Sequence, residues 1–237
     1  MKKLPFATGS RLFVTSVLTG GALLFAASNA LSQETLADLA AGGTLTVPTP
    51  YGGLVFYDFS NISQVGDLNV PLADIYVVPT FDDGNYGVQF QSALWSLGGA
   101  SQNYDLGFNF QVAAVNGHAI IEDDNLALTG GILFAGATHV AETVSTVDDT
   151  SLSSLLVYIN SSGQSLENDA TFTGGGAYDV IKITKDFSMN TGADPLSQVF
   201  VSHFIQTFSV VSEVPEPSTL ALAGLSGLGM LLFRRRK

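Results

Sequence analysis

The chain has 237 residues and contains no cysteine, so its fold has to rest on an apolar core without disulfide bonds. It carries 21 acidic and 9 basic residues, which gives a formal net charge of −12 at pH 7. Outside the first 11 and the last four positions the only basic residues are Lys182 and Lys185. Phosphate binding requires clustered Lys and Arg side chains, so the composition excludes nucleic acid as a partner.

The first 30 residues are organised as a secretory signal peptide. Basic residues up to Arg11 precede an apolar stretch from Leu12 to Ala27, and small residues follow up to Ala30. This order predicts a signal helix and export, with cleavage after Ala30. A retained N-terminal anchor is the alternative.

Residues 31–211 predict a single all-β domain, an antiparallel β-sandwich of jelly-roll-like topology. About 180 residues are enough to bury one apolar core. Segments of high β-propensity recur, and turn-forming Gly, Asn, Asp, Ser and Pro separate them. The expected strands are 54–57, 74–78, 86–94, 105–115, 118–121, 139–144, 155–159, 179–183 and 199–211.

Local patterns refine this prediction at three places. Asn116-Gly117 between apolar runs favours a type I′ turn, so 118–121 is expected to pair with the strand before it. Phe200, Phe204 and Phe208 have helical spacing, but their β-branched neighbours favour a long final strand. Ser32 as an N-cap predicts a short helix over 34–41.

Two acidic clusters are candidates for calcium binding. Asp82-Asp83-Gly84-Asn85 and Glu122-Asp123-Asp124-Asn125 supply the hard oxygen ligands that Ca²⁺ prefers. Neither has the spacing of an EF-hand loop, and Asp and Asn also form turns between strands. Solvated turns are the favoured reading, so no cofactor is expected, with calcium left open.

Enzymatic signals are weak. The three histidines, His118, His139 and His203, fall on different expected strands without the close spacing of a metal site. Residues 94–98 lack the first glycine of a nucleophile elbow. No catalytic, cofactor or metal residue is therefore predicted, although a carboxylate pair for glycoside hydrolysis stays open among 20 acidic residues.

Aromatic and threonine side chains suggest two kinds of binding surface. Trp95, Tyr76, Tyr86 and Tyr104 could stack on sugar rings, although core packing would select the same residues. Ice binding calls for a regular Thr-x-Thr array, and the chain has isolated instances at 44–46 and 171–173.

The C-terminus has three consecutive parts. A linker, 212–218, contains Val214, Pro215, Glu216 and Pro217, and its prolines prevent it from joining a helix or sheet. Residues 219–237 then predict a single transmembrane helix that ends in a basic tail. The tail consists of Arg234, Arg235, Arg236 and Lys237. Cationic residues beside a membrane span stay in the cytoplasm, so the body is expected outside.

These three parts resemble the PEP-CTERM sorting signal, and Pro215, Glu216 and Pro217 match its motif residue by residue. The resemblance implies an exosortase, a membrane protease-like enzyme, as a partner that cuts near the motif. It also implies a Gram-negative host, an inner-membrane-anchored precursor, and a final location at the cell surface or outside the cell. Proteins of this family are associated with exopolysaccharide and biofilm.

The sequence therefore predicts an exported, non-enzymatic cell-surface or matrix protein, with polysaccharide as a partner. The alternative is a secreted carbohydrate-active enzyme or a carbohydrate-binding or ice-binding protein that uses the same sorting tail.

Overall fold

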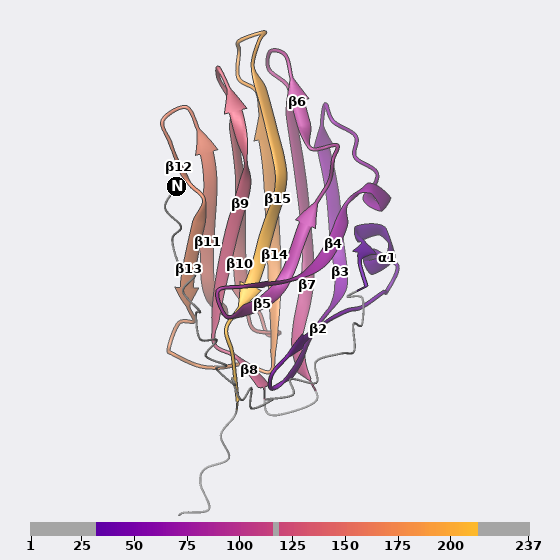
Figure 1. The fold of residues 1–237 in the computed structure, drawn as a ribbon, viewed down its shortest axis with the longest axis vertical. Helices are drawn as coiled ribbons and strands as arrows, with labels where there is room; N and C mark the ends of the chain where they lie inside the picture. The colour runs from indigo at the N-terminus through magenta and orange to yellow at the C-terminus, as the bar shows by residue number, and fades with distance from the viewer. Residues whose placement is uncertain (1–31, 116–118, 213–237) are drawn as a thin grey trace, which may run out of the picture. The chain divides into compact units, whose positions relative to one another are not determined.

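The computed structural model describes residues 32–115 and 119–212, which belong to one compact unit (Figure 1). The predicted signal peptide, the Asn116-Gly117 turn, the Pro-Glu-Pro linker and the predicted membrane helix lie outside the described residues. Among the described helices, none is long and apolar enough to span a membrane.

Two antiparallel sheets contain most of the described strands, which confirms the prediction of an all-β sandwich. Sheet A has the order β1 (Glu34–Thr35), β4 (Tyr76–Asp82), β5 (Asn85–Gln91), β15 (Gln198–Phe208), β9 (Asp123–Leu133) and β13 (Glu167–Thr171), with β6 (Ser96–Gly98) also paired to β15. Sheet B has the order β12 (Gly163–Ser165), β11 (Ser151–Asn160), β10 (Ala137–Ser145), β14 (Val180–Asn190), β7 (Asn103–Val115), β3 (Gly52–Gly66) and β2 (Leu45–Thr49).

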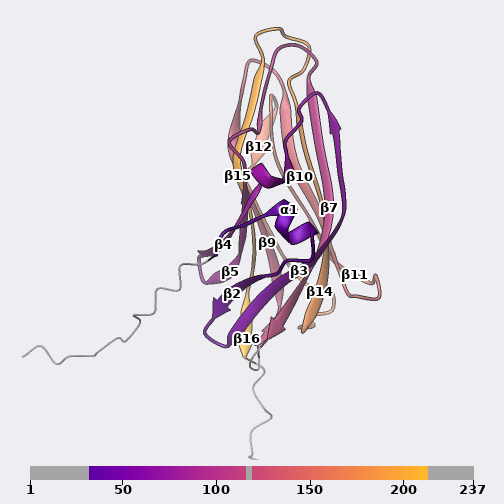
Figure 2. The ribbon, with the colours of Figure 1, turned by 90° about the vertical axis from the view of Figure 1, so that its right-hand side faces the viewer.

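The core lies between the two sheets, which Figure 2 shows from the side. Every second residue of β7 is buried, because successive side chains of a strand point to opposite faces. The ring of Phe90 on β5 lies 5.2 Å from that of Phe108 on β7, between centroids. Phe204 on β15 and Phe187 on β14 lie 5.4 Å apart in the same way. Aromatic contacts of this kind hold sheet A against sheet B.

A short helix lies at one side of the sandwich, where it contacts β1 of sheet A and β3 of sheet B (Figure 2). Helix α1 (Leu36–Ala40) buries Leu36 and Leu39 completely. Its N-cap is Thr35, whose Oγ1 accepts a hydrogen bond from the amide of Asp38 at 3.1 Å. The predicted helix was therefore correct in kind, but the predicted N-cap at Ser32 was wrong because Thr35 is closer to the first turn.

The prediction that 118–121 pairs with the preceding strand is wrong. The described part, β8 (Ala119–Ile121), pairs with β16 (Val210–Ser212) in a separate two-stranded sheet. The long final strand is confirmed as a strand, but it divides at Ser209 into β15 and β16. Ser209 leaves the sheet pattern because its amide donates to Asp123 Oδ1 at 2.6 Å.

Candidate functional site

The outer face of sheet B carries polar side chains on five neighbouring strands, β11, β10, β14, β7 and β3. Strand register places these side chains in rows that cross the sheet, since residues directly opposite one another point to the same face. One row, which we call the hollow row, consists of Val65, Asp105, Ser188, His139, Tyr158 and Ser165.

Two hollows lie on the hollow row. The first has a volume of about 410 Å³ and is lined by His139, Leu156, Tyr158 and Asn160, together with Ser162 and Gly163. The second has a volume of about 420 Å³ and is lined by residues of β3, β7 and β14: Val65, Asn103, Tyr104, Asp105, Ser188, Met189 and Asn190. Each is large enough for a ligand of a few sugar units at most.

His139 and Ser188 separate the two hollows. They are cross-strand partners, and Ser188 Oγ lies 2.8 Å from His139 Nδ1. Tyr158 is the next residue in the row, and its half-buried ring lines the first hollow. An aromatic ring beside a hydrogen-bonding imidazole can bind a ligand that has both an apolar face and hydroxyl groups.

The row beside the hollow row has a carboxylate between two small side chains at its centre. The adjacent row consists of Ser63, Gly107, Asp186, Ala141 and Leu156. Gly107 and Ala141 occupy central strands, where larger side chains would stand above the sheet. A ligand on this part of the face would therefore meet the exposed carboxylate of Asp186 between these two small side chains.

Two β-bulges arrange polar groups farther along the face, on β3. The register with β7 shifts on either side of Ser60, and Asp58 and Asn61 take positive φ values of 55° and 52°. The extra residue of a bulge is unpaired and re-aims its side chain. Here Asp58 Oδ2 accepts from Gln111 Nε2 at 2.7 Å, while Gln111 Oε1 accepts from the Tyr57 hydroxyl at 3.0 Å.

The face is acidic, which limits the ligands that suit it. Burial raises the pKa of Asp105, the neighbouring Asp186 raises it further, and His139 partly opposes both effects. The face has one lysine, Lys182, which forms an ion pair with Asp149 at 2.7 Å. Carboxylates would repel an anionic polymer, so uncharged ligands fit this face better than anionic ones.

The aromatic residues expected to bind sugars have other positions. Trp95 and Tyr104 are each 1% exposed, and Trp95 stacks on Phe204 inside the core. Tyr76 and Tyr86 are half-buried on sheet A. The expectation of core packing is thus confirmed for Trp95 and Tyr104, and all four lie away from the first hollow.

The two acidic clusters meet at Ser209, whose hydroxyl lies 2.8 Å from Asn85 Oδ1 of the first cluster and 2.6 Å from Asp123 Oδ2 of the second. Asp82 and Asn85 pair across the two-residue turn between β4 and β5, in which Asp83 and Gly84 have positive φ. Asp124 is buried in the core, whereas Asp123 binds Ser209. Within 32–115 and 119–212, no three His, Asp or Glu side chains lie close enough together to hold a metal ion.

The histidines and threonines are also dispersed. His118 lies outside the described residues, His139 belongs to sheet B, and His203 belongs to sheet A. Burial lowers the pKa of His203. Thr44 and Thr46 lie at β2 of sheet B and Thr171 at β13 of sheet A, so the two Thr-x-Thr instances do not form an array.

Sequence reasoning missed Tyr158 and its neighbours in the hollow row. The residues come from strands that are up to about 120 positions apart, and only the register shows that they adjoin. One signal was present, because Asp105 and Asn109 alternate with the buried Leu106 and Phe108, which marks them as outward-facing.

Comparison with known proteins gives one match in sequence. Residues 213–237 match the model of the PEP-CTERM protein-sorting motif, which confirms the resemblance of the tail. A tail of this type indicates an exported protein that an exosortase processes. No curated protein matches the chain.

Solved structures give distant matches in fold. TmCBM61 in complex with β-1,4-galactotriose is 18% identical, with 66% of this chain and 91% of that chain covered and a TM-score of 0.29. The xylan-binding module CBM15 is 12% identical, with 71% and 97% covered and a TM-score of 0.25. The enzymatically active domain of bacteriophage CBA120 tailspike protein 4 is 11% identical, with 63% and 19% covered and a TM-score of 0.30.

Proposed function

We propose that this chain, which ends in a PEP-CTERM protein-sorting motif, is a non-enzymatic cell-surface or matrix protein that binds a neutral polysaccharide. The binding surface is the outer face of sheet B. The observation that carries the proposal is the hollow row, in which the ring of Tyr158 adjoins the hydrogen-bonded pair of His139 and Ser188.

The chemistry of the face supports a sugar ligand. A sugar ring has an apolar face that stacks on an aromatic ring and hydroxyl groups that both donate and accept hydrogen bonds. Beside Tyr158, the hollows present the amide groups of Asn160 and Asn190 and the carboxylate of Asp105. The polymer is neutral in this proposal because the carboxylates of the face would repel anionic chains.

Delivery follows from the two ends of the chain. A signal peptide cleaved after Ala30 takes the body across the inner membrane, and the helix 219–237 holds the precursor there. An exosortase then acts near Pro215-Glu216-Pro217 and frees or transfers the body to the surface of a Gram-negative cell. Association with exopolysaccharide in a biofilm is the role that suits such a destination.

The test is binding to a panel of neutral polysaccharides, measured by calorimetry on the chain without its signal peptide. Tyr158→Ala should weaken binding about tenfold, which corresponds to about 1.4 kcal/mol. Tyr51→Ala, at an exposed tyrosine of the turn between β2 and β3, should leave the affinity unchanged. A wild-type chain that binds none of the panel, or equal losses in both variants, would show the proposal to be wrong.

A carbohydrate-active enzyme is the second candidate, and one observation favours it. Asp105 and Asp186 are diagonal neighbours on β7 and β14, and Asp186 helps to raise the pKa of Asp105. A raised carboxyl pKa beside a second carboxylate is what a glycosidase needs for acid catalysis. Release of reducing ends by the wild type, lost in both Asp105→Asn and Asp186→Asn, would establish this function.

A further inference from the structure

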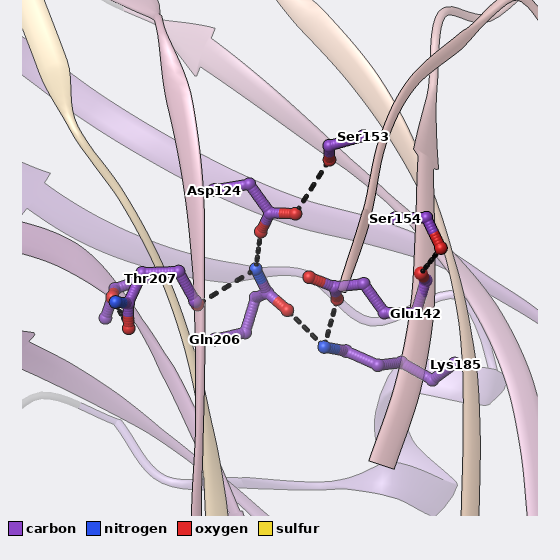
Figure 3. A network of polar contacts seen from close by, with 8 residues as sticks. Asp124, Glu142, Ser153, Ser154, Lys185, Gln206 and Thr207 are labelled. Atoms are coloured by element: carbon purple, nitrogen blue, oxygen red, sulfur yellow. Dashed lines mark hydrogen bonds and ion pairs between the residues drawn. The ribbon is translucent and has the colours of Figure 1, made fainter. Parts of the chain in front are cut away.

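A cluster of polar side chains lies inside the sandwich, between the sheets (Figure 3). Asp124 and Gln206 reach it from β9 and β15 of sheet A, whereas Glu142, Ser153 and Lys185 reach it from β10, β11 and β14 of sheet B. None of the five residues is more than 8% exposed, and Lys185 is 1% exposed. The polysaccharide-binding proposal makes no use of this cluster.

The contacts join an amine, a carboxamide and two carboxyl groups. Lys185 Nζ donates to Glu142 Oε2 and to Gln206 Oε1. Gln206 Nε2 donates to Asp124 Oδ1 and, at 3.3 Å, to the main-chain oxygen of Asn125. Figure 3 shows that Glu142 and Gln206 approach the lysine amine from different sides.

The surroundings of Asp124 favour its protonated form. Burial raises the pKa of Asp124 well above its usual range, and the nearby Glu142 acts in the same direction. Lys185 and Ser153 oppose this shift. Asp124 can therefore supply a proton, while Glu142 Oε2 accepts a hydrogen bond from Lys185 Nζ. Glu142 Oε1 has no hydrogen-bond partner among the described residues, so it can accept a proton.

A contribution of the Lys185–Glu142 ion pair to fold stability does not explain why these charged side chains are buried. Transfer of charged groups into a core is costly, and apolar side chains of similar size often stabilise a fold equally well. The lysine amine directly contacts the carbonyl oxygen of a carboxamide, with one carboxyl group at the amine and another at the amide nitrogen. This arrangement contains a nucleophile, an electrophile, a base and an acid among buried side chains.

We propose that Lys185 and Gln206 react with each other to form an intramolecular isopeptide bond. The bond would join β14 of sheet B to β15 of sheet A. It would provide a covalent link between the sheets in a chain that contains no cysteine.

The reaction needs no reagent beyond these side chains. Glu142 takes a proton from the Lys185 ammonium, and the free amine attacks Gln206 Cδ. Asp124 donates its proton to Nε2, the bond between Cδ and Nε2 breaks, and ammonia leaves. The attacking nitrogen then returns one proton to Asp124. The new bond is Nζ–Cδ, and the products are a secondary amide, ammonia and protonated Glu142. Because the fold already holds the two groups in contact, the reaction does not lose the translational and rotational entropy of a bimolecular encounter.

The intact mass of the wild-type protein and its tryptic peptides test the proposal. The mass should be lower than that of the sequence by one ammonia molecule. Lys182 and Lys185 are the only trypsin sites between Arg11 and Arg234, which makes Lys182 an internal control. After denaturation, trypsin should cut completely after Lys182 and fail to cut after Lys185, because the acylated side chain is no longer recognised.

Variants identify the reacting groups. Lys185→Arg and Glu142→Gln should have the full mass of their sequences and be cut at position 185. Lys182→Arg should keep the loss of ammonia. Gln206→Glu can lose water in place of ammonia and should then have the same mass as the cross-linked wild type. Both proteolysis and mass are measured on denatured chains, so a variant that folds poorly still gives a result.

Two outcomes would overturn the proposal. The first is a wild-type chain of full mass that is cut after Lys185, which would show a noncovalent ion pair. The second is loss of ammonia together with normal cleavage after Lys185, which would assign the loss to a succinimide at Asn116-Gly117 or another site.

Discussion

At the scale of single residues, burial changes the chemistry of Tyr104. Its side chain is 1% exposed, and its hydroxyl donates to Gln64 Oε1 at 3.1 Å. Burial raises the pKa of Tyr104 from 10.0 to about 12; the nearby Trp95 side chain lowers it in part, and the charge of Asp105 raises it. The folded state therefore holds this proton more tightly than the unfolded state does.

This shift predicts the sign of an alkaline effect on stability. The contribution of Tyr104 is complete below pH 10 and is lost as the pH rises toward 12, because the unfolded chain releases the proton first. Tyr104→Phe has no proton to release, so its free energy of unfolding should fall less steeply over this range. Urea unfolding at several pH values measures both slopes. Equal slopes for the two chains would contradict the prediction.

At the scale of strands, the pairing of β5 with β15 depends on Gly87. Gly87 lies opposite Thr207, and a methyl group on it would overlap the main-chain oxygen of Gln206. Gly87→Ala should therefore lower the free energy of unfolding by about 2 kcal/mol, as overpacking does. Gly98→Ala on β6 is the matched control, because its nearest neighbour would be the side chain of Gln198 at 3.9 Å.

The control should change stability by less than about 0.5 kcal/mol, which is usual for exposed positions. Chemical unfolding of the two variants beside the wild type gives both values. If Gly87→Ala were as stable as Gly98→Ala, the close approach of β5 to β15 would be disproved.

Strand identity followed from the sequence, but strand partners did not. High β-propensity predicted strands near β7, β10 and β15, because β-branched and aromatic residues fit a half-buried pleated surface. The same propensity says nothing about which strand lies alongside. The pairing expected between 118–121 and the preceding strand was wrong for this reason, since β8 finds its partner about 90 positions later, in β16.

The position of a residue in the alternation of a strand also indicates whether it faces the core. Tyr104 is in phase with Leu106 and Phe108, which already indicates a core position and not a sugar-binding one. Lys185 is in phase with Ile183 and Phe187 in the same way. A charged residue in the phase of the core is the sequence signal of the buried cluster. Its partners could not be predicted, because they come from four other strands.

At the scale of the whole chain, the sorting tail makes a prediction of its own. Glu216→Ala should leave the precursor in the membrane fraction, because Glu216 is the central residue of the Pro-Glu-Pro sequence within the matched sorting motif. Glu213→Ala is the control: it removes a like negative charge three positions before Glu216, and this variant should be processed normally. Immunoblots of membrane and released fractions measure the outcome. Normal processing of Glu216→Ala would disprove the assignment of the motif.

The proposed binding surface and the strand that leads to the sorting motif lie at opposite ends of the sandwich. The hollow row lies close to the connection between β14 and β15, whereas β16, which leads to the sorting motif, lies at the opposite end (Figures 1 and 2). A precursor tethered through its C-terminus would thus hold its ligand contacts a full strand length away from the tether. Binding of polymer could then begin before proteolytic release, so that newly exported molecules would hold polysaccharide at the membrane surface.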